Sequence, residues 1–458
     1  MSTAGSYISF KRKNLEIRMK RSIRNRFLSI VHDSQFIDLV LESYPNFKCV
    51  VNERCGTWYV KPVHAPFSAY FKSTDGHTGQ WSFSTRRLNL HLLDLIHDYG
   101  GIVLVDSTRR GKRMPDALSK TVPIWIATLN KCVFERLRPH DLENRQLVFF
   151  PPYLPETERS AMNKKLDGFV DLLMNSGINL DFISSKLQKP IRPLWATPTS
   201  TLSSAQFEDY HTVVLVTASK QVHDGYSREY GFLYVQGAAD DEEEWASGLS
   251  PTVFWNHADN ILSFPEEEYD SNIKCLLSKI SHDNTSTAAT TTTSDVLTYL
   301  VPTNISIGDR SKFSETENKG FFFIVNFSSQ PLNIPQELHC PIESGKKGAQ
   351  SFRKEAPKIL SKLNGIKPPW DVQDSLILLD DQGGKEIASC FALLLLSLYY
   401  DSDLRKLSTP LTLGTSQTHL DKHQIRQRLI KIIEAHPKTN PSRAFLIAVN
   451  TLLLSTSS

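Results

Sequence analysis

The sequence lacks a long hydrophobic run: none of its 458 residues lies in a stretch approaching the roughly 18 consecutive apolar residues of a membrane-spanning helix. It also lacks an apolar segment of the secretory type near its beginning, where Lys11, Arg12 and Lys13 lead into a polar stretch. We therefore expect a protein without membrane contact that works in the cytoplasm, with the nucleus as the alternative compartment.

Cysteine is scarce and scattered. The six cysteines form no C-x-x-C pair and stand at no histidine spacing typical of zinc, so the sequence indicates neither a disulfide framework nor a structural metal. The phosphate-binding pattern G-x-x-x-x-G-K-[ST] is also absent from the sequence, which argues against nucleoside triphosphate chemistry of that kind.

Charge is nearly balanced overall, with 52 Lys and Arg against 49 Asp and Glu, but it is unevenly distributed. Residues 11–26 contain eight basic residues and a single acid, Glu16, whereas Asp240–Glu244 is an acidic run. Blocks of basic residues attract phosphate backbones, and they also occur as solvated helix faces. From composition alone, both interpretations of residues 11–26 stay open.

The hydrophobic pattern predicts an α/β protein of two or three domains. Apolar strands are expected at Ile102–Val105, His211–Ala218 and Ser375–Leu379, and helices at Leu88–Tyr99 and Ile387–Tyr400.

Less regular segments complete this interpretation. Trp58–Val60 is expected to be a strand and Pro193–Trp195 a loop. Residues 281–294 are rich in Ser and Thr and have too little apolar content for a core. We therefore expect an N-terminal unit of residues 1–280, a linker with connecting strands at 281–340, and a C-terminal unit of residues 341–458.

A cationic loop follows the strand that ends at Val105. Asp106 comes directly after this strand, and the next seven residues combine two hydroxyls, one glycine and four cations. Such a loop is suited to phosphate oxygens, because small residues allow close approach and Arg neutralises the charge in bidentate fashion. A solvated loop without a ligand is the alternative. The candidate phosphate-binding residues here are Ser107, Thr108, Arg109, Arg110, Gly111, Lys112 and Arg113.

A second polar segment precedes this loop in the chain, between Tyr70 and Arg87. Its His77 stands between Gly76 and Gly79, which suggests an exposed turn. The candidate phosphate-binding residues of this segment are Lys72, Ser73, Thr74, Arg86 and Arg87, and a surface helix start is the alternative for the last two.

Several motifs together resemble the initiator-tRNA phosphoribosyltransferase family of fungi and plants. They are FKSTDGHTGQW at 71–81, STRRLNLHLL at 84–93, VDSTRRGKRMPDALSK at 105–120 and NPSRA at 440–444. The resemblance implies transfer of a 5-phosphoribosyl group from phosphoribosyl pyrophosphate (PRPP) to the 2′-hydroxyl of adenosine 64 in the T stem of initiator methionine tRNA. This mark reserves the tRNA for initiation and hinders its use in elongation.

Such a transfer requires a base for the hydroxyl proton and a metal ion for the pyrophosphate. The candidates for the base are Asp75, His77 and Asp116, and a positioned base is typically worth roughly 10²–10⁴-fold. Mg²⁺ needs only one or two carboxylates beside phosphate oxygens. We therefore expect Asp106, at its strand end, to be a catalytic residue that holds Mg²⁺, with Asp75 as the other carboxylate able to do so.

The C-terminal unit resembles a dual-specificity phosphatase domain in its order of strand, loop and helices. In that family the strand is followed by a catalytic Cys and, six residues later, by an Arg. These positions fall here on Asp381 and Ile387, so we expect no phosphatase activity. Gly383, Gly384 and Lys385 are nevertheless expected to be able to present N–H groups and one cation to an anion.

Cations at both ends of the chain are expected to bind the tRNA, and no obligate protein partner is implied. They are Lys11, Arg12, Lys13, Arg21, Arg24 and Arg26 near the N-terminus, and Arg426 and Arg443 near the C-terminus. The competing hypotheses are a phosphatase-like tRNA-binding protein without catalytic activity, and another phosphate-transferring enzyme. PRPP consumption distinguishes the first of these from the transferase.

Overall fold

A computed structural model describes residues 22–53, 55–64, 66–109, 111–141, 145–202, 204, 206–228, 231–240, 243–283, 297–313, 321–366, 375–413 and 420–454. Lys11, Arg12, Lys13, Arg21, Arg110 and most of the Ser/Thr-rich segment lie outside these residues. The chain forms two compact units. The first comprises residues 1–84, 92–172 and 180–288, and the second comprises 85–91, 173–179 and 289–458.

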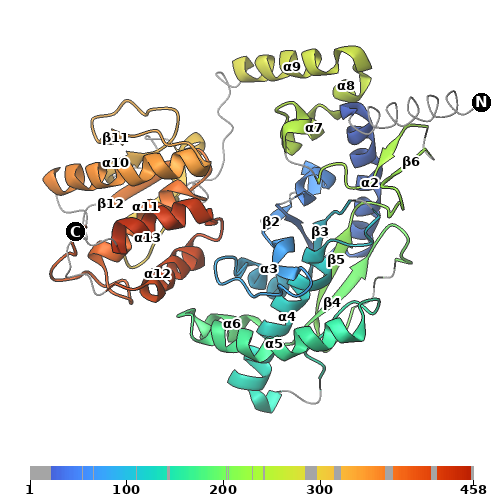
Figure 1. Ribbon diagram of the computed structural model, residues 1–458, viewed down its shortest axis with the longest axis horizontal. Helices are drawn as coiled ribbons and strands as arrows, with labels where there is room; N and C mark the ends of the chain where they lie inside the picture. The colour runs from blue at the N-terminus through green and yellow to red at the C-terminus, as the bar shows by residue number, and fades with distance from the viewer. Residues whose placement is uncertain are drawn as a thin grey trace, which may run out of the picture. The chain divides into compact units, whose positions relative to one another are not determined.

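The first unit is built on a sheet of five parallel strands in the order β2-β1-β3-β5-β4 (Figure 1). The strands are β1 (Lys48–Asn52), β2 (Phe67–Ala69), β3 (Gly101–Asp106), β4 (Ile191–Ala196) and β5 (His211–Thr217). Every residue of β3 and β5 is buried, as expected for the central strands of a parallel sheet covered on both faces. The predicted strands at 102–105 and 211–218 are confirmed.

Helices cover both faces of this sheet. On one face, α2 (Ile23–Ser43) packs Phe27, Ile30 and Ile37 against Val103 and Val105 of β3. This cluster also takes in side chains of α7 (Pro251–Asn256), α8 (Ala258–Ser263) and α9 (Tyr269–Asp283). The remaining helices of the unit are α3 (His91–Tyr99), α4 (Val122–Lys131), α5 (Glu156–Met174) and α6 (Leu180–Lys186). Because side chains alternate along a strand, Ile102 and Leu104 are buried on the opposite face.

Two local predictions in this unit were wrong. Residues 56–59 form the 3₁₀ helix η1 and not a strand, because the chain crosses the end of β3 here: a Cβ on Gly56 would lie 2.2 Å from the carbonyl oxygen of Val105. Pro193 lies within β4 and not in a loop. Among the described strands β4 pairs with β5 alone, and proline is tolerated on an edge strand because its missing N–H is not needed there.

The second unit contains a mixed sheet in the order β11-β10-β12-β9-β8. Its strands are β8 (Leu297–Tyr299), β9 (Ile305–Asp309), β10 (Phe321–Asn326), β11 (Glu337–His339) and β12 (Ser375–Asp380). Only the pair β8 and β9 is antiparallel among these described strands. Four strands from residues 297–339 therefore form one sheet with β12, whereas we expected that part of the chain to connect two units. β12 pairs with β9 on one side and with β10 on the other, so it joins the pair β8–β9 to the pair β10–β11.

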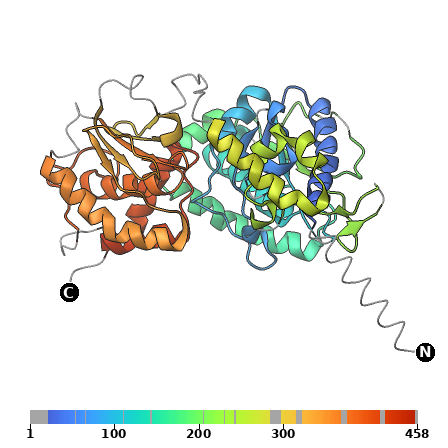
Figure 2. The same cartoon turned by 90° about the horizontal axis from the view of Figure 1, so that it is seen from above.

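Four helices pack on one face of this second sheet: α10 (Gly345–Ile366), α11 (Ile387–Tyr399), α12 (Lys422–Ala435) and α13 (Arg443–Leu454). Figure 2 shows these orange and red helices on one side of the gold strands. Every residue of α11 is buried, since it lies between the sheet and the other helices. No helix in the described parts of the chain is long and apolar enough to cross a membrane.

Candidate functional site

The carboxyl edge of the first sheet is where its polar strand ends meet. The chain runs from β1 to β2 on one side and returns to β3 on the other side of β1, so neighbouring connections diverge between β1 and β3. Open parallel sheets bind ligands at such a divergence, outside the carboxyl ends of the strands. Asn52 ends β1 and Asp106 ends β3, so these two residues flank this point.

Asp106 is fully buried and its carboxylate is bound by protein groups. One oxygen accepts hydrogen bonds from the Cys55 thiol and the Ser107 N–H, both at 2.8 Å, and the other accepts from the Asn52 amide at 2.8 Å. We expected Asp106 to hold Mg²⁺, but at 0% exposure the carboxylate is turned away from solvent. The observed geometry instead lets Asp106 join the ends of β1 and β3.

Asn52 also connects the two polar segments that the sequence singled out. Its amide group donates to the carbonyl of Phe71 at 3.0 Å and accepts from the Phe71 N–H at 2.9 Å. Phe71 is followed by Lys72, so the same asparagine holds the start of one segment and, through Asp106, the start of the other. The amide side chain can do this because it offers both a donor and an acceptor.

The loop after Asp106 is held by two side chains that sequence reasoning did not single out. The Ser219 hydroxyl donates to the Thr108 carbonyl at 2.9 Å and accepts from the Ser107 hydroxyl at 2.8 Å. Gln236 accepts from the Gly111 N–H at 2.9 Å and donates to the Lys112 carbonyl at 2.7 Å. No sequence signal marks either residue, since both lie more than a hundred positions from the loop.

These bonds change which groups of the loop are available to a ligand. The side chains of Ser107 and Thr108 are buried and their hydroxyl or N–H groups already have protein partners, in contrast to the expectation that they contact phosphate. Arg109, Lys112 and Arg113 are exposed, and the Arg113 guanidinium lies 5.1 Å from the centre of the Tyr153 ring. The loop therefore presents its cations on a fixed backbone.

The segment Ser73–Gly76 forms the 3₁₀ helix η3 and packs against the π-helical turn η4 (Ala117–Thr121). A Cβ on Gly76 would lie 2.7 Å from both the Asp116 carbonyl oxygen and the Thr121 hydroxyl, so only glycine permits this contact. The Thr121 hydroxyl in turn donates to the Lys72 carbonyl at 3.0 Å. The structure thus brings the two polar segments together.

A charged cluster forms where these segments meet. The Asp116 carboxylate lies 3.8 Å from the His77 ring and 3.3 Å from the ammonium groups of both Lys112 and Lys120. The Lys120 ammonium group is buried and also lies 2.9 Å from the Glu158 carboxylate. The Thr78 hydroxyl donates a hydrogen bond to the same carboxylate at 2.8 Å. Glu158, on α5, was not identified from the sequence because nothing in its helix distinguishes it from a solvated acid.

The described residues of this cluster do not form a metal-binding site by themselves. Among the described residues, no three His, Cys, Asp or Glu side chains are grouped so that they could hold a metal ion. Asp106 is bound by protein donors, and Asp116 is paired with lysines. Asp75 on η3 is half-buried, and within the described chain its carboxylate has no ion pair or hydrogen bond. It is therefore the carboxylate that fits a cation brought in with phosphate oxygens.

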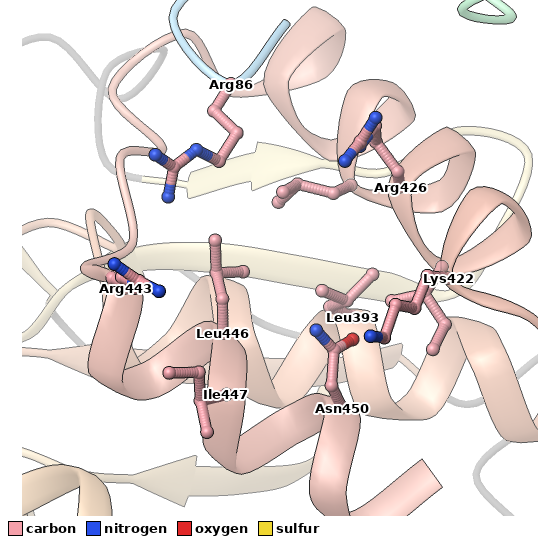
Figure 3. Close-up of a pocket in the computed structure, with 10 residues that line it drawn as sticks. Arg86, Leu393, Lys422, Arg426, Arg443, Leu446, Ile447 and Asn450 are labelled. Atoms are coloured by element: carbon pink, nitrogen blue, oxygen red, sulfur yellow. The ribbon is translucent and has the colours of Figure 1, made fainter. Parts of the chain in front are cut away.

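Arg86 and Arg87 lie apart from this cluster, although we expected them to bind phosphate with Lys72. Residues 85–91 belong to the second compact unit. There Arg86 lines a cavity of about 430 Å³ with residues of α11, α12 and α13 (Figure 3). The other residues around this cavity are Leu393, Lys422, Ile425, Arg426, Leu429, Arg443, Leu446, Ile447 and Asn450. Two cations that we expected to bind tRNA, Arg426 and Arg443, thus lie at the same cavity.

Arg24 and Arg26 are half-buried on α2. The Arg26 guanidinium donates to the Ala238 carbonyl at 2.8 Å and lies 5.3 Å from the centre of the Trp245 ring, so it contributes to packing within the first unit.

In the second unit, the loop after β12 folds around the side chain of Asp380, the last residue of that strand. The Asp380 carboxylate accepts hydrogen bonds from the N–H groups of Gln382 at 2.9 Å, Gly384 at 2.7 Å and Ala388 at 3.1 Å. Burial raises the pKa of Asp380, and these N–H groups act in the opposite direction. The expectation that Gly384 offers its N–H to an external anion was therefore wrong, because an internal carboxylate already accepts it.

The neighbouring residues of this loop are also engaged. Gly383 is buried and its carbonyl lies 2.8 Å from the His436 ring, and the Lys385 carbonyl accepts from the Asn440 N–H at 2.8 Å. Asp381 is exposed and accepts from the Ser329 N–H at 2.8 Å. Counting the Cys position from either Asp380 or Asp381 places Glu386 or Ile387 at the Arg position. Neither register provides the thiolate or the guanidinium of a phosphatase.

Comparisons with known proteins agree with this division into two units. Residues 17–278 match the model of the Rit1 N-terminal domain, and residues 336–453 match that of the Rit1 DUSP-like domain. The tRNA A64-2′-O-ribosylphosphate transferase of Saccharomyces cerevisiae is 31% identical over 98% of this chain and 95% of its own length. An uncharacterized protein of Schizosaccharomyces pombe is 59% identical over 95% of both chains.

Among solved structures, human DUSP28 is 13% identical and covers 36% of this chain and 97% of its own, with a TM-score of 0.24. A mouse putative dual specificity phosphatase complexed with zinc tungstate is 14% identical and covers 37% of this chain and 92% of its own, with a TM-score of 0.25. The family models and the yeast transferase carry the assignment: the chain belongs to the Rit1 family, with an N-terminal α/β domain and a DUSP-like domain.

Proposed function

We propose that this protein transfers a 5-phosphoribosyl group from PRPP to the 2′-hydroxyl of adenosine 64 in the T stem of initiator methionine tRNA. The single observation that carries the proposal is the meeting of the two polar segments at the carboxyl edge of the first sheet. That contact brings a histidine, a carboxylate and several cations together at the edge where parallel sheets bind ligands. The yeast relative, a tRNA A64-2′-O-ribosylphosphate transferase, supports the same reaction.

The exposed cations bind the donor in this proposal. PRPP carries a 5-phosphate and a pyrophosphate. Arg109 and Lys112 supply positive charge on a backbone held by Ser219 and Gln236, and Lys72 supplies it from the segment held by Thr121. Arg113 adds a fourth cation beside Tyr153. Preorganised cations stabilise the charge that develops on a departing pyrophosphate without rearranging during the reaction. Asp75 is the carboxylate that would hold a Mg²⁺ ion, and this ion would neutralise charge on the pyrophosphate.

His77 is the base in this mechanism, and Asp116 is its positioning residue. A bond forms between the ribose 2′-oxygen and carbon 1 of the phosphoribosyl group, while the bond from that carbon to the pyrophosphate oxygen breaks. The hydroxyl proton passes to the His77 ring, and the electron pair of the broken bond leaves with pyrophosphate. The His77 side chain is half-exposed at 50%, so it can reach a tRNA hydroxyl, and the Asp116 carboxylate 3.8 Å away orients its ring.

The test is an intact-mass measurement of initiator tRNA treated with the purified protein, PRPP and Mg²⁺. We expect a gain of one phosphoribosyl unit, located by nuclease digestion to a single T-stem adenosine, with elongator methionine tRNA unchanged. If the tRNA binds with no gain in mass and no release of pyrophosphate, the protein is instead an inactive phosphatase-like tRNA-binding protein. We place the activity in the cytoplasm, and fractionation of cells that express a tagged protein checks this.

A further inference from the structure

The cavity of the second unit has a cationic rim and an apolar floor. Arg86, Lys422, Arg426 and Arg443 surround the opening, and no Asp or Glu lines it in the part of the chain that the structure describes. Leu393, Ile425, Leu429, Leu446 and Ile447 form the floor and one wall. Figure 3 shows the four cations around the rim, with Leu393 and Leu446 between them.

The rim cations of the two helices are not used by the fold. Lys422, Arg426 and Arg443 are exposed and have no ion pair with any described residue. Arg428, on the same helix as Arg426, differs from these cations because it stabilises the fold. It is buried and donates hydrogen bonds to the carbonyls of Leu396 at 3.2 Å and Tyr400 at 3.0 Å. Lys422, Arg426 and Arg443 are therefore available for an external anion.

Ile447 is the most informative apolar residue here, because it is 54% exposed at the edge of the cationic rim. An isolated exposed apolar side chain needs no explanation, but apolar side chains beside a group of cations fit a ligand that has both a flat apolar face and negative charge. A cavity of about 430 Å³ lies within the usual range for small-molecule pockets, roughly 300–1,000 Å³. A single nucleotide has this size and this combination of base and phosphate.

We propose that this cavity binds one unpaired nucleotide of the RNA substrate, with its base against Leu446 and Ile447 and its flanking phosphates on Arg86, Arg426 and Arg443. Single-stranded RNA is commonly recognised in this way, by contact with the base face and by cations along the backbone. That the nucleotide belongs to RNA rests on the proposed function. The DUSP-like unit then binds phosphate through this cavity, while its loop after β12 is filled by Asp380.

The test compares a fluorescein-labelled adenosine tetranucleotide with an RNA duplex of equal charge, and PRPP, for binding to the full-length protein. Arg426→Ala combined with Arg443→Ala is expected to weaken binding of the tetranucleotide by about tenfold or more, since each lost bond to a charged phosphate costs at least about that factor. Duplex and PRPP binding are expected to change less than about twofold. The matched control, Arg353→Ala with Lys354→Ala, removes the same charge from exposed positions on α10.

A second variant tests the apolar wall. Ile447→Asp is expected to weaken tetranucleotide binding as well, whereas Leu39→Asp, at a residue that is 53% exposed on α2, leaves it unchanged. Both sites are exposed, so thermal unfolding of either variant is expected to match the parent protein.

Three results would overturn the inference. Equal losses for duplex and tetranucleotide would show a general cationic surface, a selective loss of PRPP binding would show a donor site, and no loss in the double variant would show that the cavity binds neither. Failure of the proposed function is separate, because it appears as unmodified tRNA in the mass measurement whatever the tetranucleotide does.

Discussion

Each unit of this protein has a loop that follows a buried strand and begins with an aspartate, and the two loops use that aspartate differently. Asp106 accepts one N–H group of its own loop, that of Ser107, but it also accepts from Asn52 and Cys55 and so joins two strand ends. Asp380 turns into its loop and accepts three of the N–H groups that an anion would need. The first loop is left with exposed cations, whereas the second is left with the exposed acid Asp381.

This difference shows that a glycine-containing loop at a strand end does not by itself make an anion site. In both loops several N–H groups already have protein acceptors. What separates them is the charge of the side chains that remain outside, because phosphate binding at an exposed site depends on cations. The proposed donor site is therefore in the first unit, and the proposed phosphate contacts of the second unit are at its cavity.

The largest expected effect is on transfer itself. His77→Ala is expected to lower the rate of tRNA modification by roughly 10²–10⁴-fold, because it removes the proposed base. Intact-mass kinetics at saturating PRPP and tRNA measure this rate. His140→Ala, at an exposed histidine outside the cluster, serves as the control and is expected to keep the full rate. An undiminished rate in the His77 variant would show that His77 is not the base.

The filled loop of the second unit is expected to show its importance in stability. Asp380→Ala leaves three N–H groups without their acceptor and is expected to lower the free energy of unfolding by about 3 kcal/mol. Asp381→Ala removes an exposed carboxylate that accepts a hydrogen bond from the Ser329 N–H, and it is expected to lower the free energy of unfolding by about 1 kcal/mol or less. Urea denaturation at pH 7 measures both. Similar losses in the two variants would mean that the loop is not closed by Asp380.

Neither the parent protein nor either variant is expected to hydrolyse p-nitrophenyl phosphate, because no Cys or Arg occupies the catalytic phosphatase positions in either register. Steady phosphate release that disappears in one of the variants would contradict this.

Acid is expected to weaken the second unit through His436. Burial lowers the pKa of this histidine from 6.5 to about 4, and its ring nitrogens lie 2.8 Å from the Gly383 carbonyl and the Thr298 hydroxyl. The unfolded chain therefore binds a proton that the folded chain does not, so stability falls as the pH drops from 6.5 towards 4. About 2 kcal/mol is expected to be lost between pH 7 and pH 5.

A His436→Gln variant isolates this contribution. Its stability is expected to be lower at pH 7 but to depend less on pH, by about the same 2 kcal/mol. His211 in the first unit has a pKa lowered to about 4 by burial as well, so it provides the matched comparison in the other unit. An unchanged pH dependence in the His436 variant would show that other groups cause the acid sensitivity.

The smallest expected effect concerns the donor. Arg109→Ala or Lys112→Ala is expected to weaken PRPP binding by about tenfold, as one charge-assisted contact is lost, with little change in tRNA binding. Lys385→Ala in the loop after β12 is expected to leave PRPP binding unchanged. Calorimetric titration with PRPP measures the affinities. Equal losses for PRPP and tRNA would instead assign the first loop to the RNA-binding surface.

Sequence reasoning succeeded where local pattern was enough. Ile102–Val105 is an uninterrupted apolar run, as expected for a strand of a parallel sheet covered on both faces, and Ser375–Leu379 contains a similar buried run after its first residue. It failed at Pro193, because the tolerance of an edge strand for proline depends on which neighbour is missing. It also placed residues 297–339 outside a unit, because their pairing with β12 is long-range.

The sequence by itself determined the α/β class, the two segments that carry the proposed chemistry, and the absence of Cys and Arg from the phosphatase positions. Only the tertiary structure decided how those groups are used. It buried Asp106 beneath Asn52 and Cys55, and it placed Arg86 beside Arg426 and Arg443. It also closed the second loop on Asp380. The physical reason is that residue type determines what a side chain can bind, whereas contacts between distant parts of the chain decide which partner it meets.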